Sequence, residues 1–379
     1  AAPTHEYPYV DGMSAFVLLS GLVLGIVYQR WVARLGFAYA YRRLLKRLAV
    51  LYVCQLFLSL LAVAASERLA PAEFRTLAHL PGRESLATKL EWALTMRYLP
   101  SGGNILVLYL LLMASALVLI PLLARGLWPL VLGASLLLYA STLVWPTGTR
   151  GTNFFTVDAF PGGPPIQNWA AWQILFVPAV VIGWRWDRWR VAERIDRALV
   201  PLILVAVVAG LTVERIVTSL DLRPHLVLLV DKVDLGPVRA GLSFLVVACV
   251  YGVFRAVLRW TRRDLLRPLV STGARSLDSY VLQAVCLLAI PIFVVDRPWK
   301  PVLASAIALA VFGACWAWAE LRTRFGVEKL HRAPVQVIAA VGHTWARARN
   351  GERRSERQRQ RGRPRNGEQA GQARSRVDR

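Results

Sequence analysis

The sequence predicts an all-α polytopic membrane protein, a bundle of about nine membrane-spanning helices. Hydrophobic residues make up 56% of the 379-residue chain, and the mean hydropathy is +0.44, whereas soluble domains contain roughly 45–50% apolar residues. The apolar residues come in blocks of about 17–22 bounded by charge, which is long enough to cross a bilayer core. The nine expected spans are 13–28, 47–65, 104–124, 127–145, 168–185, 199–217, 236–258, 277–295 and 300–319.

The positive charges are concentrated in three of the segments that separate these blocks. Residues 29–47 contain Arg and Lys but no acid, and residues 185–197 and 259–275 are also rich in arginine. The positive-inside rule places such segments in the cytoplasm. The longer connections, rich in Pro and Gly, alternate with them and belong outside: 66–103, 146–167 and 218–235.

This alternation of loops places residues 1–12 outside the cytoplasm. Because the first expected span cannot itself carry them across, we expect an apolar segment upstream of Ala1. Two alternatives are open at this point. The segment is either a cleaved signal peptide, which the small residues at the start would suit, or a further membrane helix.

Three regions of the chain differ in composition. Residues 1–325 form the expected membrane bundle, and residues 326–348 have the pattern of an amphipathic cytoplasmic segment at the membrane interface. Residues 349–379 are rich in arginine and poor in apolar side chains, so we expect a disordered tail. The net charge of +23 would also suit nucleic acid. The tail has no aromatic side chain to stack on bases, so we expect membrane lipids and no nucleic acid as partners.

Several patterns concern packing rather than chemistry. Gly21 and Gly25 in the first span have the GxxxG spacing that permits close approach of another helix. The cysteines all lie inside apolar blocks without CxxC spacing, so we expect buried free thiols and no metal site: Cys54, Cys249, Cys286 and Cys315. The P-loop, GxSxG and HExxH signatures of soluble enzymes are absent from the sequence.

Polar residues in or beside the spans are therefore the candidates for function, because such groups are costly in a membrane and tend to mark sites. Asp11 and Ser20 lie near the outer end of the first span, where Asp11 alternatively caps the helix. Arg97, Tyr98 and Asn104 precede or begin the third span. They suit either a polar mouth for a sugar or anion, or an interface anchor with Asn104 as helix cap.

Three further groups complete this set of candidates. Trp172 and Gln173 in the fifth span suit a substrate contact, although a Trp here also fits the aromatic belt. Lys232 and Arg239 flank the seventh span and form either a cradle for an anionic group or a charged loop with mutual pairing. Gln283 is expected to be the buried polar residue near the cytoplasmic start of the eighth span.

The histidines offer little to a catalytic account. They lie in the N-terminal stub, in expected outer loops and in the cytoplasmic segment: His5, His79, His225, His331 and His343. A general base that works at a membrane would be expected deep in a span. The printed sequence therefore leaves the base unassigned.

The order of several short motifs resembles the OpgC family, whose members are linked to succinylation of periplasmic glucans. The resemblance covers roughly residues 10–295 and depends on the shared order of motifs that are each weak. The motifs are Val10–Val17 leading into Gly21, the basic run Arg42–Arg47, Arg97–Pro100 before Asn104, Ala171–Phe176, Asp231–Lys232 and Leu235–Arg239.

The resemblance implies a membrane acyltransferase of ten helices with both ends in the cytoplasm. It implies that the segment before Ala1 is a first membrane helix that carries an Arg and a His, the His being the general base. It also implies an acyl-CoA-type co-substrate such as succinyl-CoA and no bound cofactor. Three departures leave the glucan acceptor and the succinyl donor open: Asn104 in place of Asp, Gln283 where a polar or His-bearing segment is usual, and Asn168-Trp169 in place of Asn-Pro.

The leading hypothesis is an integral membrane O-acyltransferase that modifies a cell-envelope glycan or another extracytoplasmic acceptor. It would lie in the bacterial inner membrane as a multi-pass protein with a cytoplasmic C-terminus. The donor would come from the cytoplasmic side and the acceptor from outside. The alternative is a non-enzymatic transporter or flippase, or a degenerate inactive relative. The sequence does not determine the oligomeric state.

Overall fold

The computed structural model describes residues 10–69, 84–100, 103–147, 156–163, 165–219, 229–260, 266–294 and 301–324. Contacts between residues divide the chain into two compact units, 1–315 and 316–379. Of the second unit only Trp316–Arg324, the end of the last helix, is described. The expected interfacial segment 326–348 and the arginine-rich tail 349–379 lie outside the described residues.

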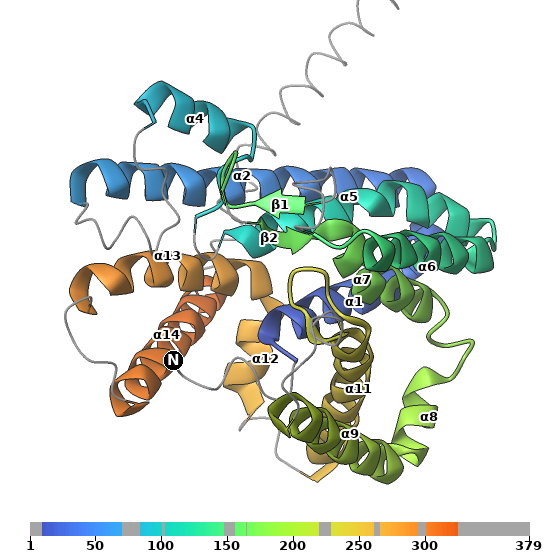
Figure 1. Ribbon diagram of the computed structural model, residues 1–379. Coiled ribbons are helices and arrows are strands. Elements are labelled where there is room, and N and C mark those ends of the chain that lie inside the picture. Colours follow the sequence, from blue (N-terminus) through green and yellow to red (C-terminus); the bar gives the residue numbers. More distant parts are fainter. Residues whose placement is uncertain are drawn as a thin grey trace, which may run out of the picture. The chain divides into compact units, whose positions relative to one another are not determined.

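The described elements are helices apart from one short strand pair (Figure 1). The two strands are antiparallel and lie between α6 and α7 in sequence. In chain order the elements are α1 (Gly12–Leu35), α2 (Phe37–Leu69), α4 (Leu86–Leu94), α5 (Asn104–Ala124), α6 (Trp128–Val144), β1 (Thr156–Asp158), β2 (Pro165–Asn168), α7 (Trp169–Trp184), α8 (Val191–Arg197), α9 (Leu199–Ser219), α11 (Pro237–Trp260), α12 (Arg267–Ala274), α13 (Ser276–Val294) and α14 (Pro301–Arg324).

These helices confirm the predicted all-α polytopic class. Six are long and apolar enough to cross a membrane: Gly12–Leu35, Phe37–Ala65, Asn104–Ala124, Leu199–Ile216, Pro237–Arg259 and Val302–Arg324. The other three expected spans correspond to shorter apolar helices, Trp128–Val144, Trp169–Trp184 and Ser276–Ala289. Each is shorter than the roughly 20 residues that cross a bilayer core without help from the flanking chain.

Helices α1 and α7 pack in parallel, and glycines bring their backbones together. A methyl group built on Gly21 would lie 2.5 Å from the carbonyl oxygen of Phe176. One built on Gly25 would overlap the carbonyl oxygen of Val180, and one on Gly183 would overlap that of Leu22. The GxxxG spacing of the first span is therefore the contact surface of α1, and Gly183 is its counterpart on α7. Such close approach gains dispersion energy where lipid offers no hydrophobic driving force.

The remaining apolar surface of the bundle faces outward. Side chains such as Leu204 and Val208 on α9 and Leu309 on α14 are largely exposed within the chain. In water such faces would favour aggregation, whereas in a membrane they contact the equally apolar lipid tails. The core lies instead among α1, α2, α5, α6 and α7, where Trp172, Tyr109 and Phe176 are fully buried.

Candidate functional site

A cavity of about 710 Å³ opens where the first residues of α1 and α5 meet β2, the turn before α11, and the α12–α13 corner. It brings together four of the ten residues that the sequence singled out: Asp11, Asn104, Lys232 and Gln283. Polar residues that complete its lining are Gln167, Thr272, Ser276, Ser279 and Tyr280. Candidates that are far apart in the sequence thus share one site.

Asp11 both caps α1 and carries a charge into this cavity. One carboxylate oxygen, Oδ1, accepts hydrogen bonds from the backbone N–H of Ser14 at 2.8 Å and from its hydroxyl at 2.7 Å. The other, Oδ2, lies 3.5 Å from Nζ of Lys232. The capping and binding interpretations of Asp11 are therefore both compatible with the geometry, because each uses a different oxygen.

The environment of Asp11 favours its charged form. Burial raises the pKa of this carboxyl, but the hydrogen bonds from Ser14 and the charges of Lys232 and Arg239 outweigh it and hold the pKa below its usual range. A carboxylate with a lowered pKa is a weak base at neutral pH. Asp11 is therefore better suited to hold a fixed negative charge beside Lys232 than to act as a general base.

A pH dependence follows from the direction of this shift. A carboxyl whose folded pKa is depressed contributes stability above its unfolded value of about 3.9, and this is lost as pH falls through the folded pKa. We expect the Asp11→Asn variant to lie closest in thermal stability to the wild type at the lowest pH tested and to fall behind it at neutral pH. A difference between the two that stays constant from pH 3 to pH 7 would contradict this assignment. Thermal unfolding in detergent at a series of pH values measures it.

Asn104 is the first helical residue of α5 rather than its cap. The structure assigns the cap position to Gly103, which has no side chain to offer the helix N–H groups. Of the two alternatives for Asn104, the helix cap is therefore wrong, and the residue lines the cavity instead. Gln283 lines it from α13 and is exposed rather than buried as predicted, because the cavity itself gives access to its side chain.

The cavity also corrects one prediction drawn from loop charge. That prediction put Gln283 at the cytoplasmic face and Asp11, Asn104 and Lys232 at the outer face, whereas all four line one cavity. The rings of Phe16 on α1 and Tyr280 on α13 lie 6.2 Å apart. The reason is that the end of segment 259–275 folds as helix α12, and the corner between α12 and α13 lies beside the start of α1.

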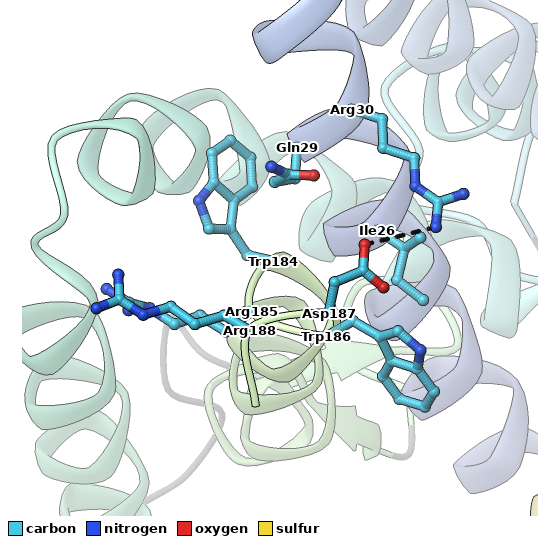
Figure 2. A pocket seen from close by; sticks show the side chains of 9 residues that line it. Ile26, Gln29, Arg30, Trp184, Arg185, Trp186, Asp187 and Arg188 are labelled. Atoms are coloured by element: carbon cyan, nitrogen blue, oxygen red, sulfur yellow. Dashed lines mark ion pairs between the residues drawn. The ribbon is translucent and has the colours of Figure 1, made fainter. Parts of the chain in front are cut away.

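A second, smaller cavity lies at the other ends of α1 and α7. It has a volume of about 230 Å³ and is lined by Arg30, Arg185, Asp187 and Arg188 together with Gln29 and tryptophans. Arg30 and Asp187 form an ion pair at 3.7 Å, and the two face one another while Arg185 and Arg188 extend to the other side (Figure 2). The guanidinium of Arg185 lies 5.1 Å from the ring of Trp128 and 5.9 Å from that of Trp189.

Ion pairs connect parts of the basic segments that were expected in the cytoplasm. Arg30 belongs to segment 29–47, and its partner Asp187 belongs to segment 185–197. Further along, Asp196 pairs with Arg255 at 3.0 Å and with Arg259 at 2.7 Å. Residues of the three basic segments therefore pair with one another, Arg30 with Asp187 and Asp196 with Arg259. The end of segment 259–275 lies elsewhere, since Thr272 and Gly273 line the cavity that holds Asp11.

A sequence model of the OpgC protein family matches residues 2–326. The chain belongs to the OpgC family. No curated protein and no solved structure matches it. Membership of this family indicates a membrane acyltransferase-like role in glucan modification, with acyltransferase activity in general.

In this OpgC-family chain, Trp172 and Gln173 hold the framework rather than line a described cavity. Trp172 is fully buried, and its indole N–H donates to the carbonyl of Val233 at 3.2 Å. The Gln173 side chain accepts from the hydroxyl of Ser135 at 2.6 Å and donates to the Ser135 carbonyl at 2.8 Å. These contacts join α7 to α6 and to the turn before α11, which places Lys232 at the cavity.

Asp234 makes the central contacts of this framework. The sequence did not indicate this structural role. Its carboxylate accepts from the Thr147 N–H at 2.7 Å, the Thr147 hydroxyl at 2.6 Å and the Asn168 amide at 2.9 Å. Asn168 in turn caps α7 through Ala170 N–H. Two features of the sequence could have drawn attention to these residues. Asn168 matches the Asn of the Asn-Pro that the family resemblance led us to expect, and Asp234 lies shortly before Pro237, the first residue of α11.

Replacing Asp234 by asparagine is expected to destabilise the fold by about 1–3 kcal/mol, because buried donors lose a charged acceptor. The side chain is 4% exposed, so water cannot replace the lost bonds. The matched control is Asp187→Asn, which breaks an ion pair whose Asp side chain is 76% exposed; such pairs contribute about 1 kcal/mol at most. Equal thermal stability of the two variants in detergent would contradict this role of Asp234.

The other four candidates occupy different surroundings. Arg239 is 6% exposed and donates through Nε to the carbonyl of Val230 at 3.2 Å, so it supports the cavity from behind Asp11. Ser20 hydrogen-bonds to Tyr109, whose ring packs edge-on against Phe16. Tyr98 is buried, and its hydroxyl has no hydrogen-bond partner among the described residues. Arg97 lines a third cavity, described below.

Proposed function

We propose that this chain is an inner-membrane O-acyltransferase that places an acyl group on a hydroxyl of a cell-envelope glycan. The observation that supports this most directly is the 710 Å³ cavity, in which a paired Asp11 and Lys232 face amides and hydroxyls from four separate segments. The acceptor glycan would bind there from outside, and the acyl donor would approach from the cytoplasmic side, where the C-terminus also lies.

The lining of the cavity suits a sugar. Asn104 and Gln283 each offer both donors and acceptors, as an array of hydroxyl groups requires. The amide oxygen of Gln167 is buried and has no hydrogen-bond donor among the described residues, so a ligand hydroxyl would satisfy it. Phe16, Ile105 and Ile166 supply apolar wall for the C–H face of a sugar ring.

The reaction proposed is transfer from a thioester of the acyl-CoA type, such as succinyl-CoA. The glycan hydroxyl oxygen attacks the thioester carbonyl carbon, its proton passes to a general base, and the C–S bond breaks to release the thiol. The family resemblance implies a His as this base. The chain's own described residues would bind and orient the acceptor, with Lys232 donating to a sugar oxygen and Asp11 holding Lys232 in place.

The test is the acyl-ester content of envelope glycans extracted from cells with and without the gene. We expect a class of ester to disappear on deletion and to return when the full natural gene is restored. If no acyl ester changes, the enzyme proposal is wrong. A transporter or flippase would instead leave the total ester content unchanged and alter the amount of glycan found outside the membrane.

A further inference from the structure

A third cavity, of about 460 Å³, lies beside the first one and has no role in the function proposed so far. It is lined by the residues just after α4, by one face of α5, and by strand β1 with the turn that follows it. The residues lining it are Thr95, Met96, Arg97, Val107, Leu110, Leu111, Thr156, Val157, Asp158, Phe160 and Pro161. Arg97 is therefore separated from Asp11 and Lys232 and belongs with Asp158 instead.

The two cavities are neighbours across the β1–β2 pair. Val157 on β1 lines the third cavity, and its pairing partner on β2, Gln167, lines the first. Adjacent strands lie about 4.8 Å apart. Both cavities also use the first turns of α5, Asn104 and Ile105 for one and Val107 for the other.

Asp158 presents an unsatisfied acceptor in the third cavity. Its Oδ1 is buried and receives no hydrogen bond from any described residue. The strand register shifts between Val157 and Asp158, and such irregularities redirect a side chain away from the regular face of a strand. A buried acceptor without a donor costs stability, so its persistence needs an explanation such as a ligand hydroxyl. Burial also raises the pKa of Asp158.

The frame around Asp158 is firmly built. The N–H of Leu99 donates to the carbonyl of Ala159 at 2.8 Å, which ties the segment before α5 to the end of the strand pair. The ring of Phe160 stacks on Trp92 with their centroids 6.5 Å apart and their planes 10° from parallel. Met96 adopts a left-handed backbone with φ 57°, a conformation that is held at a cost for a residue other than glycine.

We propose that this third cavity is a second sugar subsite, which binds the unit of the glycan chain next to the one being acylated. The inference rests on the proposed function, because it assumes a polymeric sugar acceptor in the first cavity. Asp158 accepts a sugar hydroxyl, the Arg97 guanidinium donates to the same sugar unit, and Phe160 contacts the C–H face of the ring. A glycan that crosses the β1–β2 pair occupies both cavities at once.

The experiment measures acyl transfer by the full natural protein in detergent to glucose and to glucose oligomers of increasing length. For the wild type we expect KM to fall as the acceptor becomes long enough to reach the second subsite. Asp158→Asn is expected to raise KM for the long oligomers about tenfold, to the value for short ones, with kcat unchanged, because one hydrogen bond to a charged group is lost. Arg97→Gln, at an exposed side chain, is expected to act in the same direction.

The matched control is Glu91→Gln, which removes an exposed carboxylate on α4 that lines neither cavity. If Asp158→Asn and Arg97→Gln retain the wild-type dependence on acceptor length, the second subsite is refuted while the acyltransferase proposal stands. If no acceptor is acylated by any form, the proposed function fails. Calorimetric binding of the long oligomer to wild type and Asp158→Asn then decides the subsite, since equal affinities refute it and weaker binding by the variant supports it.

Discussion

Replacing Gly25 by leucine is expected to prevent α1 from packing against α7, so that most of the protein no longer folds. Even a single methyl group there would overlap the Val180 carbonyl and lie 2.7 Å from the Trp184 nitrogen. These are backbone atoms of a neighbouring helix, so they cannot move aside as a flexible side chain would. Overpacking typically costs about 1–3 kcal/mol, and a clash with backbone at a helix crossing should reach or exceed the upper end. The yield of monodisperse protein in detergent and its thermal unfolding measure the effect.

The matched control is Gly133→Leu on α6. A Cβ built at Gly133 meets nothing within 4 Å, so the same substitution adds the same bulk without a clash. Gly25→Ala should fall between the two, since the overlap begins with the first carbon. Equal stability of the Gly25→Leu and Gly133→Leu variants would show that the glycine contact between α1 and α7 is not what holds these helices together.

Replacing Lys232 by alanine is expected to lower acyl transfer about tenfold to a hundredfold while the protein remains folded. The loss corresponds to the roughly 1.5–3 kcal/mol of a hydrogen bond to a charged group that the cavity would make with its acceptor. Stability should change less than activity, because the Lys232 side chain is 57% exposed and Asp11, at 8% exposed, keeps its two hydrogen bonds from Ser14 when the ion pair is lost. Initial rates with a glucan acceptor, measured beside a thermal unfolding curve, separate the two effects.

Asp11 gives a second measurement of the same arrangement. If Asp11 acts by positioning Lys232, then Asp11→Asn in the Lys232→Ala background should lower the rate by less than it does alone, since the two effects overlap. Arg125→Ala, at an exposed site that lines none of the described cavities, controls for loss of positive charge. If the Lys232→Ala variant transferred the acyl group at the wild-type rate, Lys232 would not be part of the binding site.

Much of the architecture could be predicted because each membrane span is one continuous apolar stretch of the sequence. A bilayer demands that a helix satisfy its own backbone, so a block of apolar residues such as 104–124 predicts α5 without knowledge of its neighbours. The GxxxG contact of the first span could also be predicted locally, because Gly21 and Gly25 have no side chain to keep another helix away. The capping role of Asp11 was equally local, since it involves only the first turn of its own helix.

The site itself was predicted only in part. The sequence supplied Asp11, Asn104, Lys232 and Gln283 as separate candidates, each judged by its own span. It offered no means to separate them from Trp172 and Gln173, because a buried amide or indole is equally polar whether it binds a ligand or a carbonyl of the framework. Asp158 was missed altogether, since its unsatisfied oxygen depends on the pairing and the register shift of β1 with β2.

The sequence by itself determined that this protein is an all-α membrane protein of the OpgC family, and which of its segments are apolar and which are basic. Only the tertiary structure decided that the corner between α12 and α13 lies beside the start of α1, so that Gln283 lines the same cavity as Asp11. The physical reason is that hydropathy and loop charge act within a window of about 20 residues. The cavity is made by segments that lie far outside such a window from one another, and its geometry depends on how each helix packs against the others.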